Sequence, residues 1–214
     1  MEQLSNRLCR YKNFNSLSTN TTAEYIASLQ SFEVRDSDVF LVSYPKSGTI
    51  WAQQIITSIY ELDGHVTEYF TNSQKMPWLE WVWGCAGGAY TRRPSPRLFT
   101  SHLSQVLMPP GLMDKKGKIV YLMRNPKDNM TSYYHFSKTL AGLETPQSFA
   151  QFFEWYLTGN GTCLHLHYLP NDDDQEESRI KFYKKTKTLR ENVIFNKFQQ
   201  FLGFLQSLYL FSDN

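Results

Sequence analysis

The sequence predicts an α/β fold with a central parallel sheet. Short apolar segments at residues 39–42, 97–101 and 118–123 are the strand candidates, and segments with helical spacing alternate with them up to about residue 159. A chain of 214 residues with 41% apolar and 15% aromatic content is long enough to bury a core, most simply as one domain. A polar stretch up to about residue 37 precedes the alternating part.

The first strand candidate runs into a turn and then into a helix, within the stretch FLVSYPKSGTIWAQQIITSIYEL at residues 40–62. Residues 39–42 form an apolar, partly β-branched run of the kind that makes a buried strand. Pro45 and Gly48 interrupt that run, and a helical pattern begins at Thr49. The apolar residues that recur at helical spacing are Trp51, Ile55, Ile56, Ile59 and Tyr60.

The Lys-Ser-Gly-Thr turn is therefore predicted to lie at a helix N-terminus, where it suits an anion. Unpaired backbone N–H groups, the positive end of the helix dipole and the Lys46 ammonium converge there, so we expect a phosphate ligand. The spacing differs from the Walker pattern, which disfavours a nucleoside triphosphatase. The alternative interpretation is an ordinary strand-to-helix connection with a surface lysine.

The other two strand candidates also end at polar residues. Residues 97–101 lead directly into His102, and residues 118–123 lead into Arg124 and then a helical segment, NMTSYYHFSKTL. Ligands of open parallel sheets bind outside the carboxyl ends of the strands, so we expect Lys46, His102 and Arg124 to converge. Taken alone, a histidine at a strand end is more often structural than catalytic.

Three motifs, YPKSGTIW, RPSPRLFTSH and RNPKDNMTSYYHF, in this order and spacing, resemble the cytosolic sulfotransferase family, and their wording is most similar to the amine sulfotransferase branch. The resemblance covers about residues 31–160. It implies a P-loop-like three-layer fold, with a central parallel sheet flanked by helices and an incomplete C-terminal part. It also implies a cytoplasmic enzyme of xenobiotic metabolism that moves a sulfuryl group from 3'-phosphoadenylyl sulfate to the hydroxyl or amine of a small aromatic acceptor.

The resemblance assigns a role to each residue that matches a motif. His102 would be the catalytic base and Lys46 would stabilise the leaving phosphate. Trp78 and Phe136 would flank the acceptor, while Arg124 and Ser132 would hold the 3'-phosphate of the donor. The residues implied for the 5'-phosphosulfate end are Lys46, Ser47, Gly48, Thr49, Ile50 and Trp51. Ile50 stands where many relatives have threonine, which puts one hydroxyl contact in question.

The sequence does not predict a metal site. Cys163, His165 and His167 could share one side of a strand, but no fourth ligand follows at a recognised interval. Glu80 could meet a cationic amine, yet similar relatives that act on phenols also carry glutamate there, so it does not by itself identify the acceptor.

We divide the chain into a polar N-terminal segment at 1–30, the N-terminal portion of a sulfotransferase domain at 31–160 and a divergent tail at 161–214. In the tail neither the family's Arg-Lys-Gly donor clamp nor its dimer motif is recognisable, so a dimer is not predicted. The alternative function is therefore a catalytically impaired variant that acts as a non-enzymatic binding or pairing remnant.

The remaining expectations come from charge, apolar runs and cysteine content. A formal charge of +2 and the lack of a long apolar run predict no nucleic-acid or membrane partner. Three widely spaced cysteines fit reduced thiols in the cytoplasm.

Overall fold

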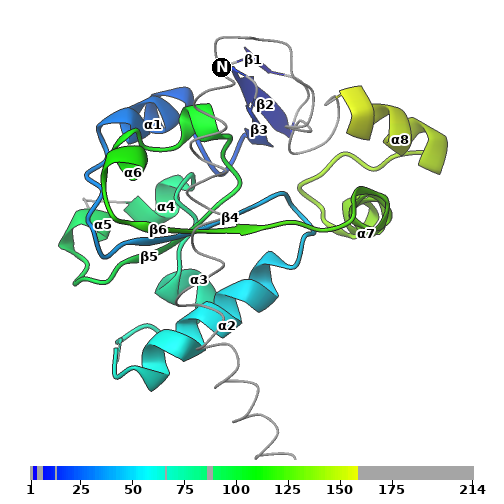
Figure 1. Ribbon diagram of the computed structural model, residues 1–214. Helices are drawn as coiled ribbons and strands as arrows, with labels where there is room; N and C mark the ends of the chain where they lie inside the picture. Colours follow the sequence, from blue (N-terminus) through cyan, green and yellow to red (C-terminus); the bar gives the residue numbers. More distant parts are fainter. Residues whose placement is uncertain (1, 4–6, 13, 66, 86–88, 159–214) are drawn as a thin grey trace, which may run out of the picture.

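The computed structural model describes residues 2–3, 7–12, 14–65, 67–85 and 89–158 (Figure 1). The predictions for the tail at 161–214 and for Cys163, His165 and His167 therefore lie outside the described residues. The strands are β1 (Glu2–Gln3), β2 (Leu8–Tyr11), β3 (Phe14–Leu17), β4 (Val39–Ser43), β5 (Leu98–Ser101) and β6 (Lys118–Leu122). The helices are α1 (Ala23–Ser28), η1 (Leu29–Ser31), α2 (Thr49–Leu62), α3 (Asn72–Lys75), α4 (Val82–Cys85), α5 (Ala89–Arg92), η3 (Gln105–Leu107), α6 (Gly111–Asp114), α7 (Pro126–Thr139) and α8 (Phe149–Thr158).

A parallel sheet with strand order β5-β4-β6 forms the centre of the molecule, which confirms the predicted fold class. In register, Val39 of β4 lies between Leu98 and Lys118 of its two neighbours. All five residues of β4 are buried, because layers cover both faces of the sheet (Figure 1). The three strand predictions agree with the observed strands to within a residue at each end.

The two faces of β4 belong to different cores, as the period of two along a strand requires. Phe40 and Val42 pack in the larger cluster with α1 and α6. Val39 and Leu41 pack in a second cluster with Ile56 of α2. Figure 1 shows α2 and α3 on one side of the sheet, and α1 and α6 on the other.

A fully buried ion pair fixes the amino ends of β4 and β5. The Arg97 guanidinium donates to both carboxylate oxygens of Asp38, and it also donates to the Glu33 carbonyl at 2.7 Å. Arg97 lies one residue before β5, and its carbonyl accepts from the Val39 N–H at 2.9 Å. The start of both strands is thereby held in one geometry.

The N-terminal segment folds onto this layer structure through a small antiparallel sheet with order β1-β2-β3. Leu8 of β2 packs against Tyr133 and Phe152, which belong to α7 and α8. Phe14 of β3 joins the large core under α1. Although the segment is polar in composition, its apolar residues thus connect two separate clusters.

Among the described residues no helix combines the length and the apolar content that a membrane crossing requires.

Candidate active site

The turn between β4 and α2 has the backbone geometry of an anion cradle. Lys46 and Gly48 both have positive φ, at 65° and 100°, and α2 begins directly afterwards at Thr49. A left-handed φ at Gly48 is a conformation that residues with a Cβ rarely adopt, which explains the glycine. The prediction that the Lys-Ser-Gly-Thr turn opens a helix is confirmed by this geometry.

Side chains at the β6–α7 end of the fold hold the turn in place. The Asn129 amide of α7 donates to the Pro45 carbonyl at 2.8 Å and to the Ser47 hydroxyl at 3.2 Å. Tyr156 of α8 donates in turn to the Asn129 side-chain carbonyl oxygen at 3.1 Å. The Arg124 guanidinium donates to the Lys46 carbonyl at 2.9 Å. The turn is therefore built by tertiary contacts as well as by its own sequence.

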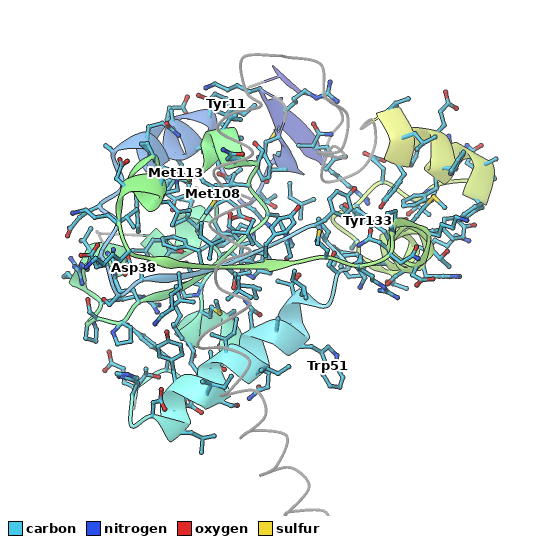
Figure 2. All side chains as sticks on the ribbon, viewed as in Figure 1. Tyr11, Asp38, Trp51, Met108, Met113 and Tyr133 are labelled. Carbon is cyan, nitrogen blue, oxygen red and sulfur yellow. The ribbon has the colours of Figure 1, made fainter. Side chains whose placement is uncertain are left out.

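A cavity of about 660 Å³ opens at the carboxyl ends of the strands, above this turn. The sequence-predicted residues that line it are Lys46, Gly48, Thr49, Ile50, Trp51, Trp78, His102, Arg124, Ser132 and Phe136. Ser47 is the exception, since its side chain is buried against Asn129. Figure 2 shows Trp51 standing away from the ribbon at the start of α2, and this side chain is 79% exposed.

The cavity has two cations near the turn. The Lys46 ammonium lies 4.0 Å from the centroid of the Phe136 ring. Burial, and secondarily the nearby Arg124 charge, lowers the pKa of Lys46. Within the part of the chain that the structure describes, neither Lys46 nor Arg124 forms an ion pair with a carboxylate. These two cations have no carboxylate counter-charge among the described residues, and they lie beside a helix N-terminus. Together they fit a ligand that carries phosphate groups.

His102 follows β5 and is oriented by β4. Its Nδ1 lies 2.5 Å from the Ser43 carbonyl, which can only accept, so Nδ1 carries the hydrogen and Nε2 keeps its lone pair. Burial lowers the pKa of His102 to about 4, against the opposing effect of this hydrogen bond. The imidazole is therefore neutral at pH 7, with Nε2 able to accept a proton.

Glu80 supports the same strand end from behind. Its two carboxylate oxygens accept from the His102 backbone N–H at 2.8 Å and from the Ser101 hydroxyl at 2.9 Å. Burial raises the pKa of this carboxyl to about 7, although hydrogen bonds from the backbone N–H groups of His102 and of Glu80 itself and from the Ser101 hydroxyl oppose the shift. The carboxyl also forms part of the cavity wall.

The aromatic wall of the cavity is positioned by β5. Leu79 donates to the Thr100 carbonyl at 2.8 Å, so that the preceding Trp78 lies beside the strand. The Trp78 ring stacks on Trp81 at a centroid distance of 5.1 Å and lies 4.4 Å from the His102 ring. Trp81 also lines the cavity, and the sequence analysis did not single it out.

Sequence reasoning did not find every residue of the site. Ser43, Asn129 and the β3 residues Asn15 and Ser16 were not predicted, although β3 supplies part of the cavity wall. The only signal for Asn129 was its place within the RNPKDNMTSYYHF segment. Nothing local to residues 14–17 indicated that they reach the cavity.

Comparison with known proteins identifies the family. The sequence-family model described as the sulfotransferase domain matches residues 36–202 of this chain. The chain belongs to the sulfotransferase family. The match extends beyond residue 160, into residues that the structure does not describe.

Individual sulfotransferases show the same similarity over part of their length. An amine sulfotransferase of Oryctolagus cuniculus is 40% identical over 161 residues, which are 74% of this chain and 52% of the relative. Human sulfotransferase 2A1 is 33% identical over 177 residues, 80% of this chain and 61% of the relative. The chain thus spans about half to three fifths of the length of these relatives.

A solved structure gives the same result for the fold. The mouse sulfotransferase SULT7A1, in a crystal structure complexed with PAP, superposes with a TM-score of 0.60 at 29% identity, over 74% of this chain and 53% of that one. The sulfotransferase fold expected from the three sequence motifs is therefore confirmed for this part of the chain.

Proposed function

We propose that the cavity binds 3'-phosphoadenylyl sulfate and that the protein transfers its sulfuryl group to the hydroxyl or amine of a small aromatic acceptor. The observation that carries the proposal is the convergence of the Lys46 turn and His102 on one cavity at the N-terminus of α2. A cytoplasmic location and a role in xenobiotic metabolism belong to the same proposal.

The donor would occupy the cationic end of the cavity. The N-terminus of α2 and the Lys46 ammonium would meet the phosphosulfate, where negative charge grows on the leaving phosphate during transfer. Arg124 and Ser132, from the β6–α7 connection and α7, would meet the 3'-phosphate. The exposed Trp51 would offer a flat face for the adenine ring, and Ile50 would contribute apolar contact only.

His102 would take the proton that the acceptor loses. The Ser43 carbonyl holds the tautomer in which Nε2 is free, as a general base requires. A pKa near 4 is low for this task, but a bound anionic donor close to the imidazole would raise it again.

The acceptor would lie between Trp78 and Phe136. The Lys46 ammonium now covers one face of the Phe136 ring, and moving to a phosphate would free that face. Donor binding would in this way prepare the acceptor wall, which is an order of events that kinetics can test.

A second candidate function concerns the part of the donor site that holds the 3'-phosphate in the family. The family's Arg-Lys-Gly motif is not recognisable in the sequence, and two missing hydrogen bonds to a charged phosphate correspond to about a hundredfold to ten-thousandfold in affinity. The chain would then be a binding or pairing remnant with slow sulfate transfer or none.

One pair of measurements on the purified 214-residue chain separates these functions. The first is transfer of radiolabelled sulfate from 3'-phosphoadenylyl sulfate to 2-naphthol, with His102→Gln as the inactive control. The second is thermal stabilisation by adenosine 3',5'-bisphosphate, where a hundredfold excess over Kd adds about 2.7 kcal/mol. Sulfate transfer that is lost in His102→Gln supports the enzyme. Stabilisation without transfer supports the remnant. The absence of both transfer and stabilisation contradicts both functions.

A further inference from the structure

Tyr156 of α8 lies behind the Lys46 turn, residues 44–49, and does not line the cavity. Its ring is 3% exposed and packs against the ring of Tyr44, which opens the turn, at a centroid distance of 5.8 Å. Its hydroxyl donates to the Asn129 side-chain carbonyl oxygen at 3.1 Å. Burial raises the pKa of the Tyr156 hydroxyl, so the hydroxyl keeps its hydrogen at neutral pH and remains a donor.

We propose that Tyr156 is a positioning residue for the sulfate donor: its hydroxyl fixes the Asn129 amide, and that amide holds the Lys46 turn in the shape that receives the phosphosulfate. The inference deepens the proposed function and rests on it for the identity of the ligand. Tyr156 acts through Asn129 and the turn, and it has no contact with the cavity itself.

The orientation of the Asn129 amide is determined on both sides. Its nitrogen donates to the Pro45 carbonyl at 2.8 Å and to the Ser47 hydroxyl at 3.2 Å, and its oxygen accepts from Tyr156. The Pro45 carbonyl can only accept, so a flipped amide would place two oxygens against each other. Asn129 is 3% exposed, which leaves solvent little access to replace a lost partner.

The direction of the Pro45 carbonyl decides where the next N–H group points. The C=O and N–H of a trans peptide point to opposite sides, so a carbonyl held toward α7 turns the Lys46 N–H away from α7. Lys46 then adopts its left-handed conformation, with φ at 65°. That conformation is unfavourable for a residue with a Cβ, and the contacts of the turn have to stabilise it.

The carbonyls of the turn are bonded, and several of its N–H groups are left over. The Tyr44 carbonyl accepts from the Ser47 N–H at 3.3 Å. Within the part of the chain that the structure describes, the N–H groups of Lys46, Gly48 and Thr49 have no acceptor. These are the groups that an anion at the start of a helix would meet, and their directions depend on how the carbonyls are held.

The variant Tyr156→Phe removes one hydroxyl and keeps the aromatic ring. We expect its affinity for adenosine 3',5'-bisphosphate, measured by isothermal titration calorimetry, to fall about threefold to tenfold, because the turn spends less time in the receptive shape. Amide hydrogen exchange by NMR without ligand reports the turn itself. The N–H groups of Ser47 and Ala52, which donate to the Tyr44 and Gly48 carbonyls, should exchange faster by about the same factor.

Tyr134→Phe is the matched control. The Tyr134 ring lies in the same aromatic cluster, 5.6 Å from the Phe152 ring, and its hydroxyl makes no hydrogen bond with the rest of the described chain. This variant should equal wild type in both measurements.

The background Asn129→Leu separates positioning from general stability. Tyr156→Phe should there leave the affinity for the bisphosphate unchanged within about twofold, because the amide through which it acts is gone. It should also raise Tm in that background, since the buried hydroxyl has lost its partner. A residue that contributed only to overall stability would instead change affinity and Tm in the same direction.

Unchanged affinity or unchanged exchange in Tyr156→Phe overturns the inference. An equal effect in Tyr134→Phe, or a further loss of affinity in the Asn129→Leu background, overturns it as well. Failure of the proposed function is a separate result. If wild type does not bind the bisphosphate, donor binding is contradicted, and the exchange of Ser47 and Ala52 then decides alone whether Tyr156 positions the turn.

Discussion

Substitution of Lys46 by alanine tests the cationic end of the cavity most directly. Lys46 has a left-handed backbone, with φ at 65°, and alanine adopts that conformation at a similar cost. The hydrogen bond from Arg124 goes to the backbone carbonyl of residue 46, so the substitution leaves it in place. The change therefore removes the ammonium group and little else.

The expected effect on stability is small. The substitution removes the cation–π interaction of the ammonium with the Phe136 ring at 4.0 Å, and such interactions contribute about 0.5–1 kcal/mol at partly exposed sites. Relief of repulsion from Arg124 offsets part of that destabilisation. For a chain of this size, 1 kcal/mol corresponds to about 2–4 °C in Tm.

The expected effect on function is large. Loss of one preorganised group that stabilises the developing charge costs about 3 kcal/mol, or roughly a hundredfold in the rate of transfer. Single-turnover transfer of radiolabelled sulfate measures this rate, and calorimetric titration with adenosine 3',5'-bisphosphate measures the matching decrease in affinity. Lys127→Ala is the control, since it removes a nearby exposed lysine of α7 that does not line the cavity.

The outcome that refutes the reasoning is equally definite. If Lys46→Ala binds adenosine 3',5'-bisphosphate and transfers sulfate as wild type does, Lys46 does not meet the donor. If Lys127→Ala loses as much activity as Lys46→Ala, the effect reflects net charge rather than the position of Lys46.

Three further predictions concern other parts of the fold. The double change Arg124→Ala and Ser132→Ala should abolish any preference for adenosine 3',5'-bisphosphate over adenosine 5'-phosphate in calorimetry, and a preserved preference would show that the 3'-phosphate lies elsewhere. Asp38→Ala should lower the free energy of unfolding by about 3–5 kcal/mol in urea titrations, because it leaves the buried Arg97 guanidinium without its partner; a decrease under about 1 kcal/mol would contradict this. The pKa of Glu80 is higher in the folded protein than its ordinary value of 4.5, so the unfolded chain binds fewer protons between pH 4.5 and 7, and the folding stability contributed by this group falls as pH rises through that window. Glu80→Gln should therefore gain stability relative to wild type from pH 5 to pH 7, by about 2 kcal/mol in urea titrations, and a difference independent of pH would disprove the shift.

Local sequence patterns were sufficient for the central sheet. Buried parallel strands are typically continuous apolar runs bounded by turn residues, and β4 has that form. β5 and β6 contain shorter apolar runs, and β6 buries only Ile119 completely. The carboxyl ends of parallel strands lie at the same edge of a sheet. The order of strands and polar residues in the chain was therefore enough to predict that these polar residues converge. The cavity brings Lys46, His102 and Arg124 together at that edge.

Helical spacing was a weaker guide at the first turn of α2. Trp51 shares the period of Ile56 and Ile59, which are buried, yet it is exposed beside the cavity. The spacing of apolar residues describes one face of a helix, but a residue in its first turn can lie beyond the edge of the core. Only the packed structure shows whether an apolar helix residue lies in the core or is exposed beside the cavity.

The sequence by itself determined the strand-turn-helix units, the edge at which they meet and the residue types that could bind a phosphosulfate. Tertiary structure alone decided the states of those residues. The tautomer of His102 depends on a carbonyl 59 positions away in β4, and the turn at Lys46 depends on an amide of α7 more than eighty positions away. The raised pKa of Glu80 likewise depends on what surrounds it. Protonation, hydrogen-bond pairing and exposure are set by neighbours in space, and contacts between distant segments leave no periodic pattern in the chain.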